Sequence, residues 1–159
     1  AGAYPVKAVE MMDRVARQVE QHQLADGGFT DLTQGDDEES LSPSLALYQA
    51  LARSTAQISR DLAVRAVCVR TTKGTSAAVV SATRPSAPII ALTHNETVAR
   101  RLALCWGAVP RVISVDEFEN PKQAARDQAL AMNLCCEGQY LLLLTGFGKS
   151  EPSLTVVPV

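Results

Sequence analysis

Short and almost uninterrupted apolar runs, each about the length of a strand, recur after residue 42 and alternate with helix-length segments. Strands that are apolar on both faces are typical of a largely parallel sheet that helices cover on both sides. The pattern predicts helices over 43–58, 75–83, 95–105 and 120–136, and strands over 63–70, 88–92, 109–113, 140–144 and 154–159. The predicted fold class is therefore α/β, a three-layer αβα sandwich with a five-stranded, mostly parallel sheet.

Local signals refine this prediction at several boundaries. Ser42 and Asn95 are suitable caps for the helices that follow them, and Gly138 is expected to end the helix over 120–136. Residues 147–153 are too few for a crossover helix, so we expect the last strand to run antiparallel to the others.

The chain before residue 42 has a different character. Residues 1–25 contain a predicted helix from about Pro5 to Leu24, in which Pro5 suits an early helical position. Apolar residues form a stripe along it at three- and four-residue intervals: Val6, Val9, Met12, Val15, Ala16 and Val19. Residues 26–41 are acidic and rich in turn formers, which predicts a flexible linker, and 42–159 form the α/β domain.

Charge and composition exclude several classes of partner. The formal net charge of -2 offers no general attraction for nucleic acid or for an anionic membrane, so an anion site must be local. No apolar run reaches the length of a membrane span, and the first residues lack the features of a signal peptide.

The cysteines and histidines do not form a metal-binding pattern. Cys68 and Cys105 lie in apolar runs and read as core residues, whereas Cys135 and Cys136 are expected to point in different directions on a helix. There is no CxxC pair and there are two histidines, so we expect no metal site and reduced thiols in a cytoplasmic protein.

The segment Thr71 to Ser76 has the chemistry to hold a phosphate. It lies between a predicted strand and a predicted helix, where ligands bind in open α/β sheets. Gly74 lets the backbone approach a ligand, and the first amides of the following helix can donate to an anion. The hydroxyls of Thr71, Thr72, Thr75 and Ser76, together with the Lys73 ammonium, complete the predicted cradle. A capped helix without a ligand remains the alternative on these residues alone.

The rest of the chain provides few candidates for chemistry. Lys149, in the turn after the strand over 140–144, is predicted at the same sheet edge and is a candidate second contact for an anion. His22, His94 and Trp106 have no sequence signature of catalysis, and no nucleophile with a general base is apparent. We therefore assign no catalytic residue and no cofactor to this chain.

Several motifs in order resemble one family, the pyruvate kinases. Residues 2–12 resemble the segment that opens the last barrel helix of these enzymes, and 67–77 resemble the strand, effector-phosphate loop and helix of their C-terminal domain. Residues 84–95, with Arg84-Pro85 and Ala87-Pro88, and residues 106–110 follow the family's subsequent motifs. The resemblance extends over nearly the whole chain.

The resemblance implies a part of a glycolytic enzyme that transfers phosphate from phosphoenolpyruvate to ADP. Such enzymes use Mg2+ and usually K+ on a (β/α)8 barrel, whose catalytic lysine and metal ligands have no counterpart here. The implied parts are the last barrel helix, a linker and the regulatory domain, so we expect this fragment to be inactive alone. The family's tetramers imply a homo-oligomer formed through the C-terminal domain, and an exposed apolar stripe on the first helix.

In the family, the loop that corresponds to 71–76 binds the phosphate of an allosteric sugar phosphate such as fructose 1,6-bisphosphate. This chain has Lys73 where serine is usual, and its turn over 146–153 is shorter than the usual effector loop. Three readings follow: a regulatory domain that binds a sugar phosphate or a nucleotide monophosphate, a structural oligomerisation domain with a vestigial anion site, and an independent phosphate-ester enzyme. The first is preferred, and the last is the weakest because no base or metal cluster accompanies the loop.

Overall fold

The computed structural model describes residues 2–25, 43–147 and 151–159. The chain divides into two units, Ala1–Thr30 and Asp31–Val159, which are considered separately. The predicted linker over 26–41, the Ser42 cap and Lys149 lie outside the described residues.

Residues 2–25 of the first unit contain one helix, α1 (Pro5–Ala25), as the sequence predicts. Pro5 is its first residue, where a missing N–H breaks no helical hydrogen bond. The apolar stripe is exposed to solvent, from Val6 at 69% to Val19 at 49%. An ion pair between Arg17 and Asp13, one turn apart at 2.8 Å, lies on the surface of the same helix. Exposure of so many apolar side chains along one helix marks a surface that is suited to packing against protein.

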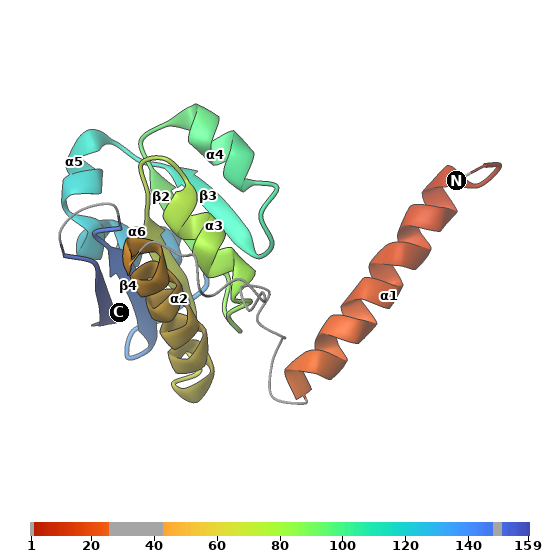
Figure 1. The fold of residues 1–159 in the computed structure, drawn as a ribbon, viewed down its shortest axis with the longest axis horizontal. Helices are drawn as coiled ribbons and strands as arrows, with labels where there is room; N and C mark the ends of the chain where they lie inside the picture. Colours follow the sequence, from red (N-terminus) through yellow and green to blue (C-terminus); the bar gives the residue numbers. More distant parts are fainter. Residues whose placement is uncertain (1, 26–42, 148–150) are drawn as a thin grey trace. The chain divides into compact units, whose positions relative to one another are not determined.

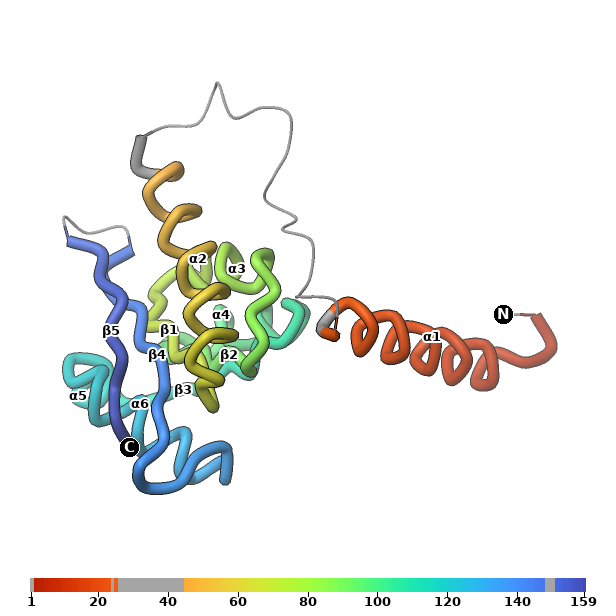
Figure 2. The backbone as a smooth tube through the Cα atoms, turned by 90° about the horizontal axis from the view of Figure 1, so that it is seen from below, coloured from red at the N-terminus to blue at the C-terminus, as the bar shows by residue number. Residues whose placement is uncertain are grey.

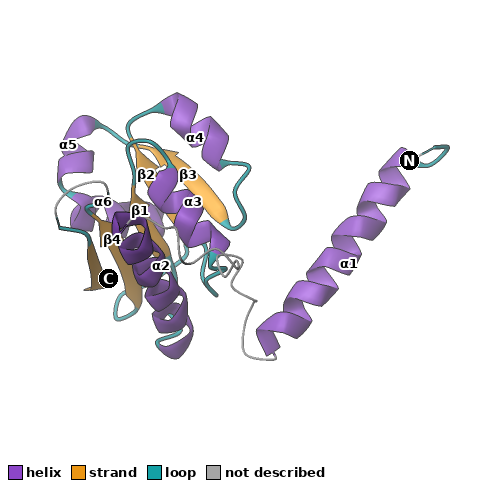
Figure 3. Ribbon diagram, in the orientation of Figure 1, coloured by secondary structure: helices purple, strands orange, loops and turns teal. Residues whose placement is uncertain are grey.

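The second unit is an α/β domain (Figures 1 and 3). Its helices are α2 (Pro43–Asp61), α3 (Thr75–Ala82), α4 (Glu96–Leu102), α5 (Val115–Glu119) and α6 (Pro121–Ala131). Its strands are β1 (Val67–Arg70), β2 (Ile89–Thr93), β3 (Ala108–Val112), β4 (Tyr140–Thr145) and β5 (Ser153–Pro158).

The five strands form one sheet in the order β3-β2-β1-β4-β5. The pairs that join β3, β2, β1 and β4 are all parallel, and β5 pairs antiparallel with β4. In the centre of the sheet, Val67 of β1 is aligned with Ile89 of β2 and with Leu142 of β4. The predicted five-stranded sheet with an antiparallel last strand is confirmed.

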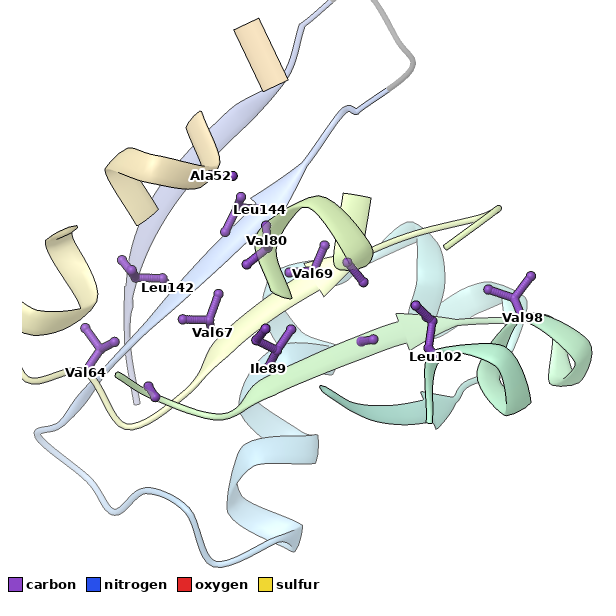
Figure 4. Close-up of a cluster of buried hydrophobic side chains, with 13 residues drawn as sticks. Ala52, Val64, Val67, Val69, Val80, Ile89, Val98, Leu102, Leu142 and Leu144 are labelled. Carbon is purple, nitrogen blue, oxygen red and sulfur yellow. The ribbon is translucent and has the colours of Figure 1, made fainter. Parts of the chain in front are cut away.

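Helices cover both faces of this sheet and create two apolar cores. In one core, Val67 and Val69 of β1 pack beneath side chains of α2, α3 and α4, including Ala52, Val80 and Leu102 (Figure 4). The second core, on the opposite face, includes Cys68 of β1, Phe118 of α5 and Ala125 of α6. Figure 2 shows α2 and α3 on one side of the strands and α5 and α6 on the other. The three-layer arrangement explains why the central strands β1 and β2 are apolar up to their last residues, Arg70 and Thr93.

Strand β1 begins later than the strand predicted over 63–70. Ala63 adopts a positive φ of 46°, and the N–H of Val64 donates to the Ser59 carbonyl at 3.2 Å. This six-residue closure is the usual end of a helix, although glycine is the common residue at its left-handed position. Residues 63–64 therefore complete the end of α2, and residues 65–66, which hydrogen-bond to Tyr140 and Leu142, lead into β1.

The prediction of one helix over 120–136 is right at its start, because α6 begins at Pro121, but it is wrong at its end and does not include the helix before it. A short helix, α5, precedes it, with a capping box in which the Ser114 hydroxyl accepts from the Glu117 N–H at 3.2 Å. Helix α6 ends at Ala131, and Asn133 then takes a positive φ of 54°. Gly138 therefore does not end the helix but lies in the turn before β4.

The early end of α6 also corrects the prediction for two cysteines. Cys135 and Cys136 lie beyond the helix, in the segment that leads to β4, where Cys135 is buried and Cys136 is exposed.

Asn95 caps α4 as predicted, because its side-chain oxygen accepts hydrogen bonds from the N–H groups of Thr97 and Val98. The remaining helix and strand bounds differ from the predictions by at most a few residues, which is usual for element ends.

Candidate functional site

The predicted phosphate loop connects the central strand β1 to helix α3. The N–H of Thr71 donates to the Leu92 carbonyl of the neighbouring strand at 2.9 Å, so the loop starts with a sheet hydrogen bond. The Thr71 side chain is buried, and its Oγ1 accepts a hydrogen bond from the Gly74 N–H at 3.0 Å. Between these two residues, Thr72 and Lys73 are exposed at the top of the turn.

Gly74 is required by both its backbone conformation and its surroundings. Its φ of 91° lies in the left-handed region, which residues with a Cβ rarely adopt. A Cβ at this position would also approach Val98 Cγ1 at 3.3 Å and Leu102 Cδ2 at 3.5 Å. The loop therefore turns tightly against α4 while it leads into α3.

The start of α3 offers backbone donors to an anion. The first intrahelical bond runs from the Ala78 N–H to the Gly74 carbonyl at 3.0 Å. The amides of Thr75, Ser76 and Ala77 precede that bond, at the end of the helix where the dipole favours negative charge. No acidic residue occupies the first turn of α3. An anion is therefore favoured here by the helix dipole and meets no carboxylate in that turn.

A pocket of about 380 Å3 opens beside this helix end. It is lined by residues of α2, of the loop and the first turns of α3, and of the segment that follows β4: Tyr48, Thr71, Thr72, Lys73, Thr75, Ser76, Val79 and Phe147. The chain leaves β1 toward β2 on one side, while β4 lies on the other side of β1. The pocket thus lies at the carboxyl edge where the strand order reverses, the usual place for a ligand in such sheets.

Five of the six predicted loop residues line this pocket, and Gly74 does not. Gly74 instead lines a neighbouring hollow of about 290 Å3 on the α4 side, together with Arg101 and Cys105. Lys73 and Thr75 line both spaces. The structure therefore brings the predicted residues together around one helix start, with glycine in a supporting position.

Two aromatic residues of the pocket were not identified from the sequence as site residues. The rings of Tyr48 and Phe147 stack with their centroids 4.7 Å apart and their planes at 26°. Tyr48 comes from α2 and Phe147 follows Gly146, whose positive φ of 80° turns the chain after β4. A Cβ on Gly146 would collide with the Glu151 carbonyl oxygen. No local sequence signal connects the two aromatic residues, because they meet only when α2 packs beside β4.

Neither histidine is among the residues that line this pocket. His94 is exposed after β2, and its ring meets Phe118 edge-on with centroids 4.8 Å apart. Arg70 stacks on the same Phe118 ring and donates to its carbonyl at 3.0 Å. His22 lies on α1, in the other unit. In the described part of the chain, no group of three or more His, Cys, Asp or Glu residues could hold a metal ion.

Trp106 and the buried cysteines take part in packing. The Arg84 guanidinium stacks over the Trp106 ring at 4.5 Å. All four cysteines are free, and Cys68 is buried while Cys105 packs partly buried against the core. Burial raises the pKa of Cys68 to about 12, with a smaller contribution from the nearby Cys135. Such thiols remain protonated and unreactive at neutral pH.

Residues 2–25, 43–147 and 151–159 include no helix that combines the length and the apolar character needed to span a membrane.

Comparison with known proteins identifies the family. Residues 49–155 match the family described as "Pyruvate kinase, alpha/beta domain". The chain is 33% identical to a pyruvate kinase of Agrobacterium vitis over 159 residues, which cover 97% of this chain and 31% of that protein. It is 33% identical to pyruvate kinase of Geobacillus stearothermophilus and 36% identical to that of Staphylococcus haemolyticus, covering 98% of this chain and 25% of each of those proteins.

The chain thus spans between a quarter and a third of the length of these relatives. The matched region includes strands β1 to β4, the loop over 71–76, α3 and the pocket-lining Phe147, and it ends within β5. This chain belongs to the pyruvate kinase family, and residues 49–155 are its C-terminal α/β domain.

Proposed function

We propose that this domain is a regulatory and oligomerisation domain that binds a phosphorylated effector at the loop over 71–76. The observation that carries the proposal is the pocket at the carboxyl edge of β1, where hydroxyl side chains, Lys73 and the start of α3 converge. The ligand would be a sugar phosphate or a nucleotide monophosphate. Its phosphate would accept hydrogen bonds from the Thr75 and Ser76 amides.

The whole enzyme that contains such a domain would be a cytoplasmic, glycolytic pyruvate kinase that transfers phosphate from phosphoenolpyruvate to ADP. We assign that reaction, and its Mg2+ and K+, to a barrel domain of the longer polypeptide. In this proposal the chain by itself has no transferase activity. Phosphoryl transfer by the 159-residue chain alone would contradict that assignment.

Regulation requires that the effector bind two quaternary states with different affinity. We propose a homo-oligomer formed through this domain, tetrameric in the complete enzyme, as the element that changes. Light scattering of the chain with and without ligand tests the first part. A monomer under all conditions would contradict oligomerisation through this domain.

Calorimetric titration tests effector binding directly. The 159-residue chain is titrated with inorganic phosphate, a panel of sugar phosphates and nucleoside monophosphates. We expect at least one compound to bind more tightly than ~1 mM, which corresponds to roughly 4 kcal/mol. Weaker binding of every compound would favour the alternative, a structural domain with a vestigial anion site.

A further inference from the structure

A second hollow lies beside the loop over 71–76, on the side of α4. Its volume is about 290 Å3, and its walls come from the loop, from the first turn of α3, and from α4 with the segment that follows it. Lys73 and Arg101 contribute two cationic side chains, and Thr75 contributes a hydroxyl. The rest of the lining is apolar and includes Val98 and Leu102. This α4-side hollow therefore combines positive charge with an apolar surface.

The two cations of the α4-side hollow have no acidic partner. In the described part of the chain, neither Lys73 nor Arg101 takes part in an ion pair. The salt bridge of α4 joins Glu96 to Arg100 at 3.2 Å and does not include the next residue, Arg101. None of the described residues that line the hollow is Asp or Glu. Two unpaired positive charges beside one hollow attract an anion into it.

The floor of the α4-side hollow is apolar, and Gly74 leaves it open. Val98 and Leu102 are 8% and 3% exposed and belong to the core that α2, α3 and α4 cover (Figure 4). A Cβ on Gly74 would come within 3.3 Å of Val98 Cγ1 and 3.5 Å of Leu102 Cδ2. A ligand on this floor places part of its surface against hydrocarbon, where a hydroxyl group loses its hydrogen bonds to water. A matching ligand therefore has an anionic head and an apolar body.

We propose that the α4-side hollow binds a small organic acid, with its carboxylate beside Lys73 and Arg101 and its hydrocarbon part on Val98 and Leu102. A guanidinium can hold both oxygens of a carboxylate in two parallel hydrogen bonds. The volume of about 290 Å3 is close to the lower limit of about 300 Å3 for ligand pockets, which suits a compact ligand. This site is separate from the proposed effector pocket, which opens on the α2 side of the loop. It does not depend on the proposed function.

The test is a titration of the isotope-labelled 159-residue chain with isovalerate, followed by NMR of the backbone amides. We expect saturable shifts of the Thr75, Ala78 and Leu102 amides. Acetate has the same carboxylate but lacks the branched hydrocarbon, and it should bind about tenfold more weakly because less apolar surface is buried. Isoamyl alcohol has the hydrocarbon but no charge, and it should also bind about tenfold more weakly because it loses both charge pairs.

Variants of α4 and α3 locate the site. Arg101→Met should lower the affinity for isovalerate about fivefold, because one exposed charge pair contributes about 1 kcal/mol at most. Arg100→Met removes the neighbouring arginine, which pairs with Glu96, and should leave that affinity unchanged. Ala78→Leu adds a larger side chain to the wall of the hollow and should abolish isovalerate binding. Urea denaturation of each variant establishes that it is folded before titration.

The outcomes separate this proposal from the proposed effector site. Arg101→Met and Ala78→Leu should keep the affinity of the natural chain for inorganic phosphate, whereas Lys73→Met should weaken the binding of both anions, because Lys73 lines both spaces. Shifts that do not saturate with isovalerate, or an affinity that survives both Arg101→Met and Ala78→Leu, would overturn the organic-acid site and leave the effector site standing. Saturable binding of isovalerate without any binding of phosphate would support the organic-acid site and contradict the effector site.

Discussion

The Thr71 Oγ1 accepts a hydrogen bond from the Gly74 N–H at 3.0 Å, and this bond closes the turn that leads from β1 into α3. Thr71 is buried at the end of the strand, whereas Gly74 begins the helix in a left-handed conformation. The hydroxyl thus fixes the turn from inside the protein, and the exposed Thr72 and Lys73 are presented above it.

Replacing Thr71 tests this relationship. Thr71→Val preserves the shape of the side chain but leaves the Gly74 N–H without its acceptor in a buried position. We expect a loss of about 1–3 kcal/mol in the free energy of unfolding, measured by urea denaturation. Thr71→Ser, which retains the hydroxyl, is the matched control. Equal stability of the valine variant and the natural chain would show that the bond does not stabilise the turn.

Gly74→Ala should both destabilise the fold and weaken phosphate binding. The left-handed conformation costs a residue with a Cβ about 1–2 kcal/mol, and relief of the strain would displace the loop. Gly138→Ala is the control, because Gly138 has a similar φ of 83° and open space around it, but precedes β4 at the other edge of the sheet. The control should lose comparable stability in urea and keep its calorimetric affinity for phosphate. An unchanged affinity in Gly74→Ala would show that the loop is not the site.

Lys73→Met should weaken phosphate binding and its dependence on salt. An exposed charge pair contributes about 1 kcal/mol at most, so we expect about fivefold lower affinity at low ionic strength. The difference between the natural chain and the variant should shrink as sodium chloride screens the charge. Lys122→Met removes an exposed lysine from the start of α6, on the opposite face, and should leave the affinity unchanged. A Lys73→Met variant that binds as tightly as the natural chain would remove Lys73 from the proposed site.

Buried Cys68 should make stability depend on alkaline pH. Burial raises the pKa of its thiol to about 12, above the ordinary value of 9.0. Between these two values the unfolded chain loses the thiol proton and the folded chain keeps it, so the free energy of unfolding falls as pH rises. Urea denaturation from pH 8 to 11 measures the slope. Cys68→Ala should show a shallower decrease than the natural chain, and identical slopes would contradict the effect.

Gly74 and Phe147 differ in whether their roles in the candidate site could be predicted from the sequence. Gly74 belongs to a strand–turn–helix segment, and its left-handed conformation and its hydrogen bond to Thr71 arise within a few residues of the chain. The loop, the Asn95 cap and the antiparallel last strand could therefore be predicted. Phe147 becomes a site residue only through its contact with Tyr48, and no short-range pattern encodes that contact.

The errors in the predicted helix ends also arise where no short-range sequence signal marks the end. Ala63 and Asn133 end helices in left-handed conformations without the glycine that usually marks such an end. The prediction also missed the short helix α5, although a capping box formed by Ser114 and Glu117 marks its start.

The sequence alone determined the α/β class, the family and the strand–turn–helix segment that contains the loop over 71–76, because apolar periodicity, caps and turn residues act over short distances along the chain. Only the tertiary structure decided the strand order β3-β2-β1-β4-β5 and the composition of the pocket. Those features depend on which faces pack together, and packing joins residues that are far apart in the sequence. The loop over 71–76 can therefore be predicted from its own residues, whereas the contact between Tyr48 and Phe147 exists only in the folded domain.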